Sequence, residues 1–397
     1  MAQSRLPRGF KASGVHCGIK RFNKDLALIY TDSPAKAAGV FTKNRVKAAP
    51  IHVTRDVLSK GLPIHAIIIN SGNANCCTGK NGNNDAKKMA QVTSENLGLK
   101  FNNVCVASTG IIGKRLPIDD IVRSIPVAVK RLSEKGLKGL AKAILTTDRR
   151  EKIKTLRFSV DEKEVNITGV CKGAGMICPN MATMLCFIMT DANVEKDALN
   201  TALKRAVNNT FNRITIDGDM STNDCVLILA NGRSENKIIR KNTKSFELFL
   251  GMLNEVCLHM AEAIVKGGEG ATKFVRVNVC GAKTEDDAVA VARSIADSCL
   301  VKTSVHGQDA NWGRIAASIG ASMAGGISQK RMEIYLDGVC MFKKGTFTNP
   351  SGRRTSRIYK KKAVRIDINL RNGSKCAGMF TCDLSKRYVE INSHYLT

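Results

Sequence analysis

The chain has 397 residues, 43% of them hydrophobic and 24% charged, so it can bury a sizeable core and is expected to form two or three domains. Its 62 Lys and Arg against 34 Asp and Glu give a net charge of +28, which favours anionic substrates or partners. No apolar run approaches the roughly 20 residues of a membrane span, so we expect no transmembrane helix.

The cysteines and the first residues bear on where the protein acts. The fourteen cysteines form no CxxC pair and no Cys/His pattern of zinc spacing, which favours free thiols in a reduced, cytoplasmic compartment and predicts no metal site. The first two dozen residues carry basic and no acidic side chains, as a mitochondrial transit peptide does. However, residues 9–20 (GFKASGVHCGIK) have the character of a first strand, so we expect this segment to belong to the fold.

Strand-like runs alternate with helical patterns along the chain, which predicts an α/β or α+β layered architecture. The expected strands are residues 25–30, 65–70, 104–108, 154–160, 164–170, 184–190, 225–232, 274–281, 332–339 and 364–370. The expected helices are residues 85–98, 196–211, 246–264 and 284–300. A composition change near Lys273, after which strands and helices restart, predicts a domain boundary there.

Two glycine-rich stretches invite a phosphate-binding interpretation. In residues 72–81 (GNANCCTGKN), six residues separate the glycines where a P-loop has four, and Asn81 replaces the metal-binding Ser or Thr, which argues against a P-loop. In residues 106–117 (VASTGIIGKRLP), Thr109 and Gly110 could aim donors at an anion or a developing oxyanion. Taken alone, the residues favour a tight turn there.

Thr183 opens an apolar run and has two interpretations. A threonine in a strand usually packs, because it is β-branched. As a nucleophile, its hydroxyl would need a base, and the six scattered histidines form no triad pattern. The remaining base is the residue's own α-amino group, with an ordinary pKa of about 7.7–8.0, freed if the preceding peptide bond is cut.

Residues 172–192 (KGAGMICPNMATMLCFIMTDA) resemble the cleavage-site signature of the glutamate N-acetyltransferase family, the ornithine acetyltransferases of arginine biosynthesis. Further blocks resemble the same family in the same order and cover nearly the whole chain. They are residues 8–20, 34–51, 70–79, 107–113, 146–148, 215–224, 267–275, 309–315 and 382–397.

The resemblance implies a precursor that cuts itself between Ala182 and Thr183. The products would be an α chain (1–182) and a β chain (183–397), assembled as two of each. It also implies a layered α/β/β/α main domain, completed by residues 183–274, and a smaller C-terminal α/β domain over residues 275–397.

The activity that the resemblance implies is acetyl transfer from N2-acetylornithine to glutamate through an acetyl-threonine intermediate, without a cofactor. Acetyl-coenzyme A as a further donor stays open. The implied catalytic residues are Thr183 as nucleophile and Thr109 and Gly110 as oxyanion hole. The implied substrate-binding residues are Thr146 or Thr147, Lys172, Thr183, Glu269, Asn392 and Thr397.

The chain departs from the family pattern at two places near predicted site residues. Ala174 stands where the family more often has serine, and Gly267 and Lys266 precede Gly268 where an acidic residue often occurs.

Two other functions are compatible with parts of the sequence. A nucleic-acid-binding protein would explain the charge, but aromatic residues are only 5% and the basic clusters are dispersed. A threonine-nucleophile aminopeptidase or amidase would share the self-processing chemistry and use water as acceptor.

Overall fold

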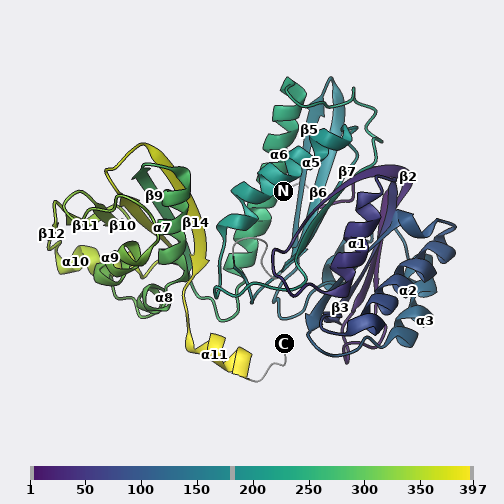
Figure 1. Ribbon diagram of the computed structural model, residues 1–397, viewed down its shortest axis with the longest axis horizontal. Coiled ribbons are helices and arrows are strands. Elements are labelled where there is room, and N and C mark those ends of the chain that lie inside the picture. The colour runs from purple at the N-terminus through teal and green to yellow at the C-terminus, as the bar shows by residue number, and fades with distance from the viewer. Residues whose placement is uncertain (1–3, 179–183, 394–397) are drawn as a thin grey trace.

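The structure is a computed structural model that describes residues 4–178 and 184–393. It has two domains, each built around one mixed sheet (Figure 1). The first sheet comprises β1 (Phe10–Val15), β2 (Leu26–Phe41), β3 (Ile64–Asn73), β4 (Val104–Ile111), β5 (Lys152–Val160), β6 (Lys163–Lys172), β7 (Leu185–Thr190) and β8 (Cys225–Ala230). The second comprises β9 (Phe274–Ala282), β10 (Glu333–Leu336), β11 (Val339–Lys343), β12 (Thr346–Phe347), β13 (Ala363–Asn369) and β14 (Lys375–Cys382).

Helices cover both sheets. The α-helices are α1 (Ala49–Ser59), α2 (Gly79–Leu97), α3 (Ile118–Lys130), α4 (Leu137–Ala143), α5 (Lys196–Asn209), α6 (Lys244–Lys266), α7 (Glu285–Asp297), α8 (Cys299–His306), α9 (Trp312–Ala321), α10 (Gly352–Ile358) and α11 (Lys386–Ser393). Within the described residues, Phe101–Asn103 and Phe211–Arg213 form 3-10 helices.

The long strand β2 folds the first sheet into two facing halves. The sheet order is β4-β3-β2-β8-β7-β6-β5, with β1 also paired to β2. The first part of β2 pairs with β1 and β3, and its last six residues, from Lys36 to Phe41, pair with β8. Apolar side chains of both halves, such as Ile69 on β3 and Phe187 on β7, share one core cluster. The two halves are therefore the inner layers of a sandwich.

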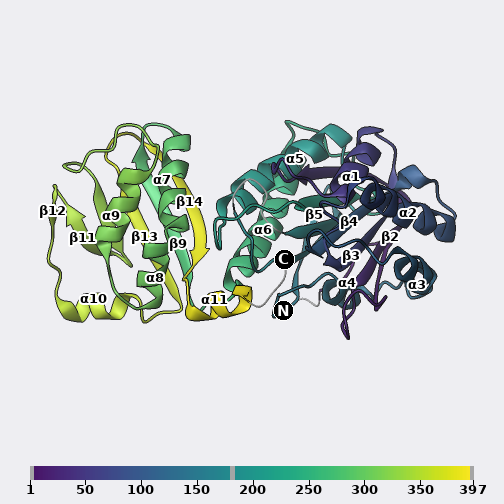
Figure 2. The ribbon, with the colours of Figure 1, turned by 60° about the horizontal axis from the view of Figure 1, so that its bottom comes forward.

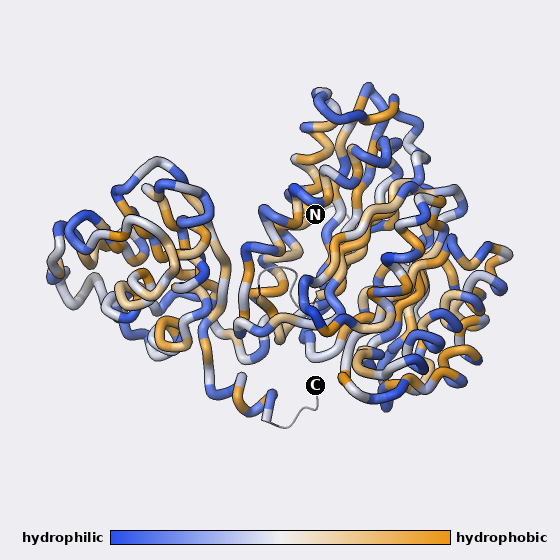
Figure 3. The backbone as a smooth tube through the Cα atoms, viewed as in Figure 1, coloured by the Kyte–Doolittle hydropathy of each residue, from blue (hydrophilic) through white to orange (hydrophobic). Residues whose placement is uncertain are grey.

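Helices form the outer layers of this sandwich. Helices α5 and α6 pack on the β5–β8 half, and α2 and α3 pack on the β1–β4 half, each through a core cluster of its own. Figure 1 shows these helices on opposite sides of the strands. In Figure 3 the apolar residues concentrate in the strands and on the helix sides that face them. The first domain is thus a layered α/β/β/α fold.

Helix α6 shows how the sequence determines this packing. Thr243 caps its first turn by accepting the N–H of Phe246 at 3.2 Å, and apolar residues at three- and four-residue steps bury one side. By length and composition, α6 is the one helix in the described part of the chain that could cross a membrane. Its apolar side packs against β5 and β6 within the core.

The second domain has the strand order β12-β11-β10-β13-β9-β14, with β9 and β13 parallel and the other pairs antiparallel. Helix α7 packs on β9 and β14. After β14 the chain leaves this sheet, and α11 extends back toward the first domain (Figures 1 and 2). The predicted boundary near Lys273 lies beside the first residue of β9.

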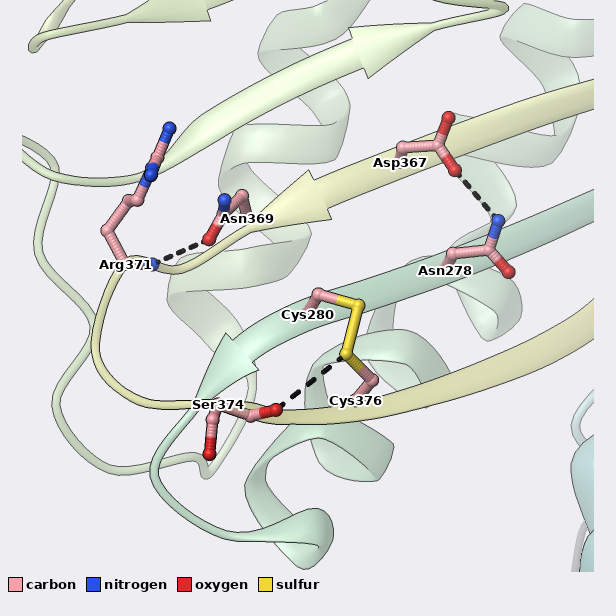
Figure 4. Close-up of a disulfide and its surroundings, with 7 residues drawn as sticks. All are labelled: Asn278, Cys280, Asp367, Asn369, Arg371, Ser374 and Cys376. Carbon is pink, nitrogen blue, oxygen red and sulfur yellow. Dashed lines mark hydrogen bonds between the residues drawn. A yellow bond between two sulfur atoms is a disulfide. The ribbon is translucent and has the colours of Figure 1, made fainter.

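Cys280 on β9 and Cys376 on β14 form a disulfide (Figure 4). They are 96 residues apart in sequence, but the antiparallel pairing of the two strands brings their Cα atoms to 4.1 Å. The expectation that all cysteines are free thiols is therefore wrong for this pair. Sequence spacing could not reveal it, because the two residues become neighbours only through strand pairing. The other twelve cysteines are free.

Candidate active site

A pocket of about 300 Å³ lies where the first domain meets α11. Seven residues predicted from the sequence line it, although they come from separate segments of the chain. They are Thr109, Gly110, Thr146, Thr147, Lys172, Glu269 and Asn392. The remaining predicted residues, Ala182, Thr183 and Thr397, lie outside the described residues.

Thr109 and Gly110 stand at the carboxyl end of β4. Thr109 is buried, and Gly110 has φ +135° and lies opposite Gly72 on the parallel neighbour β3. A Cβ added to Gly110 would lie 2.2 Å from the carbonyl carbon of Gly72, so only glycine fits. This close approach keeps the Gly110 peptide fixed beside the Thr109 hydroxyl.

Lys172 ends β6 and contacts Thr109. Its ammonium donates to Oγ1 of Thr109 at 3.2 Å, and its side chain is almost wholly buried. A hydroxyl has one hydrogen and two lone pairs. Because the oxygen of Thr109 accepts from Lys172, its own hydrogen remains available to another acceptor in the pocket. A donor held in place in this way is what a developing oxyanion requires.

Asp148 is the carboxylate that lies beside the two buried lysines, Lys152 and Lys172. Its carboxylate accepts the Gly173 N–H at 2.7 Å and pairs with the ammonium of Lys152. Burial raises the pKa of Asp148, but Lys152, Lys172 and the hydrogen bonds outweigh burial, and the pKa lies below its usual value. Burial lowers the pKa of Lys172, an effect that Asp148 opposes. Asp148 therefore favours the charged form of Lys172, although burial leaves the pKa of Lys172 below its usual value.

Glu269 adds a carboxylate to the lining of the pocket. Its Oε2 accepts the side-chain N–H of Asn392 at 2.9 Å, and its backbone N–H donates to Ala174 at 2.8 Å. It is 8% exposed. The bond from Asn392 ties α11 to the pocket, and Lys172 and Glu269 together supply one cation and one anion for a zwitterionic ligand.

Asp217 and Tyr388 also line the pocket, and neither was predicted from the sequence as a site residue. Asp217 accepts the backbone N–H groups of Met176 and Ile177, each at 2.7 Å, and the Tyr388 hydroxyl at 3.2 Å. Burial raises the pKa of Asp217 to about 6 against the opposing effect of the two N–H groups. The only sequence signal was its position in the block 215–224. Asp217 joins the segment before residue 179 to α11.

The two threonines of the TTD stretch both line the pocket, so the choice between them stays open. The backbone N–H of Thr146 donates to Asp148 at 3.3 Å. In the described ranges, no three His, Cys, Asp or Glu side chains cluster as metal ligands would.

Gly175→Ala should raise KM for the substrates that bind in this pocket roughly 10- to 100-fold, the equivalent of one charge-assisted hydrogen bond of about 1.5–3 kcal/mol. A Cβ at Gly175 would lie 2.3 Å from Oε2 of Glu269, so the carboxylate has to move away from Asn392. Steady-state kinetics measure the change. Gly251→Ala in α6 is the matched control, because its Cβ meets no atom within 4 Å. Equal KM values in the two variants would contradict a role of the Glu269 carboxylate in substrate binding.

The four-layer fold carries a pocket in which Thr109 and Gly110 can act as an oxyanion hole, as an acyl-transferring enzyme requires. The chain belongs to the ArgJ family, whose model matches residues 11–397. It is 47% identical to the "Arginine biosynthesis bifunctional protein ArgJ" of Caldanaerobacter subterraneus subsp. tengcongensis, over 99% of this chain and 98% of that protein. It is 43% identical to the protein of the same name from Thermotoga neapolitana, over 99% of this chain and 100% of that protein.

A solved structure is also similar. The crystal structure of the arginine biosynthesis bifunctional protein argJ from Bacillus halodurans matches with a TM-score of 0.51 and 38% identity. The match covers 53% of this chain and 98% of the solved chain. The family and the fold place this chain among the acetyl-transferring enzymes of arginine biosynthesis, and a nucleic-acid-binding or hydrolytic main function is not favoured.

Proposed function

We propose that the chain is a glutamate N-acetyltransferase that moves acetyl from N2-acetylornithine to glutamate through Thr183. The observation that carries this proposal is the pocket, which gathers Thr109, Gly110, Lys172, Glu269 and Asn392 beside the amino end of β7. These groups come from four segments of the chain. Membership of the ArgJ family supplies the reaction class.

In the first half-reaction, Oγ1 of Thr183 attacks the acetyl carbonyl of N2-acetylornithine, and the α-amino group of Thr183 takes the hydroxyl proton. The resulting oxyanion accepts from the Thr109 hydroxyl and the Gly110 N–H. The bond to nitrogen then breaks, the α-ammonium returns the proton, and ornithine leaves. Glutamate repeats these steps in reverse with its own amine and leaves as N-acetylglutamate.

The charged groups of the pocket suit both substrates. Lys172 is buried, and its ammonium form, which Asp148 favours, can pair with the α-carboxylate common to ornithine and glutamate. Glu269 can accept from the amide N–H or the amine at the reacting nitrogen. Thr146, Thr147 and Asn392 are further polar residues of the lining, and we expect one of the two threonines to contact substrate. The roles of Thr397 and Thr183 in binding substrate remain predictions from the family resemblance.

The base of this mechanism requires self-cleavage between Ala182 and Thr183, since only a free amino terminus can supply it. The match to the solved Bacillus halodurans chain covers 98% of that chain but only 53% of this one. The 53% is close to the share of this chain that residues 183–397 make up. This length supports a separate β chain. We infer the same division here, with two α and two β chains in the assembly and the cytoplasm as its location.

Labelled acetyl transfer tests the proposal. The purified protein, given N2-acetylornithine with a labelled acetyl group, should produce labelled N-acetylglutamate only when glutamate is present. Release of labelled acetate at the same rate with and without glutamate would instead identify a threonine-nucleophile amidase. A third reaction with acetyl-coenzyme A and glutamate alone shows whether the enzyme also accepts that donor.

A further inference from the structure

Cys76 and Cys77 are adjacent thiols with opposite exposure. They lie between β3 and α2, in the glycine-rich stretch of residues 72–81. Cys76 is fully buried, whereas Cys77 is exposed, and both are free. Their Sγ atoms are 3.7 Å apart, which is hydrogen-bonding contact for two sulfurs. The pair therefore combines a thiol that solvent reaches with a buried one that can donate to it.

Backbone hydrogen bonds hold the loop that carries the two thiols. The Cys76 carbonyl accepts the Gly113 N–H, which follows β4, at 2.9 Å. The Asn75 carbonyl accepts the N–H of Ala49, the first residue of α1, at 3.1 Å. Because elements on two sides anchor this loop, the backbone on which Cys77 stands is fixed.

Cys77 lines a cavity of about 360 Å³ where α1 and α2 begin. Arg45, Lys47 and His52 line the same cavity, and no acidic side chain of the described residues does. Lys47 donates to the backbone carbonyl of Asn44, and neither Lys47 nor Arg45 forms an ion pair within the described ranges. Unpaired cations around an exposed thiol attract anionic reagents to it, and a thiol in such surroundings is typically reactive.

Cys76 is suited to support Cys77 but not to bond with it. Burial raises the pKa of the Cys76 thiol above its usual value; Thr222 opposes this, and contact with Cys77 adds to it. Cys76 therefore keeps a proton that it can donate to a thiolate on Cys77. A disulfide between them would be strained, because consecutive Cα atoms are about 3.8 Å apart and most disulfides need about 4.4–6.8 Å.

We propose that Cys77 is a modification site for small anionic disulfides, which the cations of its cavity select. The Cys77 thiolate forms a bond to one sulfur of the disulfide, and the bond between the two reagent sulfurs breaks. The leaving half takes up a proton and departs as a thiol. Cys77 is thus oxidised and that half is reduced, with no other oxidant. Cys77 does not line the active-site pocket, so this site is independent of the proposed acetyl transfer.

Peptide mapping of the purified protein by mass spectrometry measures exchange at each thiol. The two probes are glutathione disulfide, which is anionic, and cystamine, a disulfide that carries two ammonium groups. Cys299 is the internal control, because it is a free, exposed thiol in the second domain. We expect glutathione disulfide to modify Cys77 at least about 10-fold faster than Cys299. Cystamine should show less preference for Cys77, and added salt should reduce the difference between the probes.

Arg45→Gln and Lys330→Gln form a matched pair of variants. Both remove one exposed cation, but Lys330 lies in the second domain and does not line the cavity. Arg45→Gln should slow the reaction of glutathione disulfide at Cys77 about 3-fold and speed that of cystamine, because the cavity loses one positive charge. Lys330→Gln should change neither rate. Equal effects of the two variants would show that net charge, and not the cavity, selects the reagent.

The adduct itself separates a modification site from a thiol pair that closes. We expect one glutathione on Cys77 that persists until a reductant is added, and none at this position in Cys77→Ser. A wild-type Cys77 that reacts with glutathione disulfide no faster than Cys299, or equally fast with both probes, would overturn the proposal. Loss of two hydrogens from the peptide that contains both thiols, without glutathione, would also overturn it, since Cys76 would then have displaced the adduct.

Discussion

Thr183→Ala should leave the chain as one uncut polypeptide, with acetyl transfer reduced at least about 10⁴-fold. The change removes the hydroxyl that opens the peptide bond before residue 183 and that carries the acetyl group. It also prevents the release of the α-amino base, so both functions fail together. Mass spectrometry of the purified protein and the labelled-acetyl assay measure the two losses.

Thr183→Ser provides the matched comparison, since serine retains a hydroxyl and the same backbone. We expect this variant to cut itself and to retain part of the activity, because the nucleophile and its amino group are both present. A Thr183→Ala protein with substantial transferase activity would place the acetyl group on another residue.

Thr109→Val should lower kcat about 10²- to 10³-fold while changing KM little, because an oxyanion-hole donor acts in the transition state. Valine has nearly the shape of threonine but cannot donate to the oxyanion. It also removes the acceptor that Lys172 contacts at 3.2 Å. Steady-state kinetics over a range of both substrates separate the two parameters.

Thr93→Val is the control for burying a methyl group in place of a hydroxyl. Thr93 is fully buried in α2, where its hydroxyl donates to the carbonyl of Met89 at 2.7 Å, and it does not line the pocket. Both variants should lose similar thermal stability, but only Thr109→Val should lose activity. A Thr109→Val enzyme with the wild-type kcat would exclude its hydroxyl from the oxyanion hole.

The sequence was informative where periodicity is strong. The expected strand at 65–70 falls within β3, and the expected helix at 246–264 falls within α6, because continuous apolar runs and three- to four-residue steps record burial directly. Helix α11 gave no such signal. It buries no residue, and polar contacts such as that of Asn392 with Glu269 hold it in place.

The candidate site was predictable in its residues but not in its contacts. Family blocks identified the residues that line the pocket, whereas the bond from Lys172 to Thr109 joins strands 63 residues apart. Asp217 was not predicted because it accepts from backbone N–H groups, those of Met176 and Ile177. Any residue type can supply a backbone N–H, so no side-chain pattern marks such a contact.

The intact mass of the purified protein after incubation with N2-acetylornithine alone tests the central claim most directly. We expect two chains divided between Ala182 and Thr183, with one acetyl group on the β chain that is lost when glutamate is supplied. A single full-length chain with transferase activity, or an acetyl group on the α chain, would contradict it.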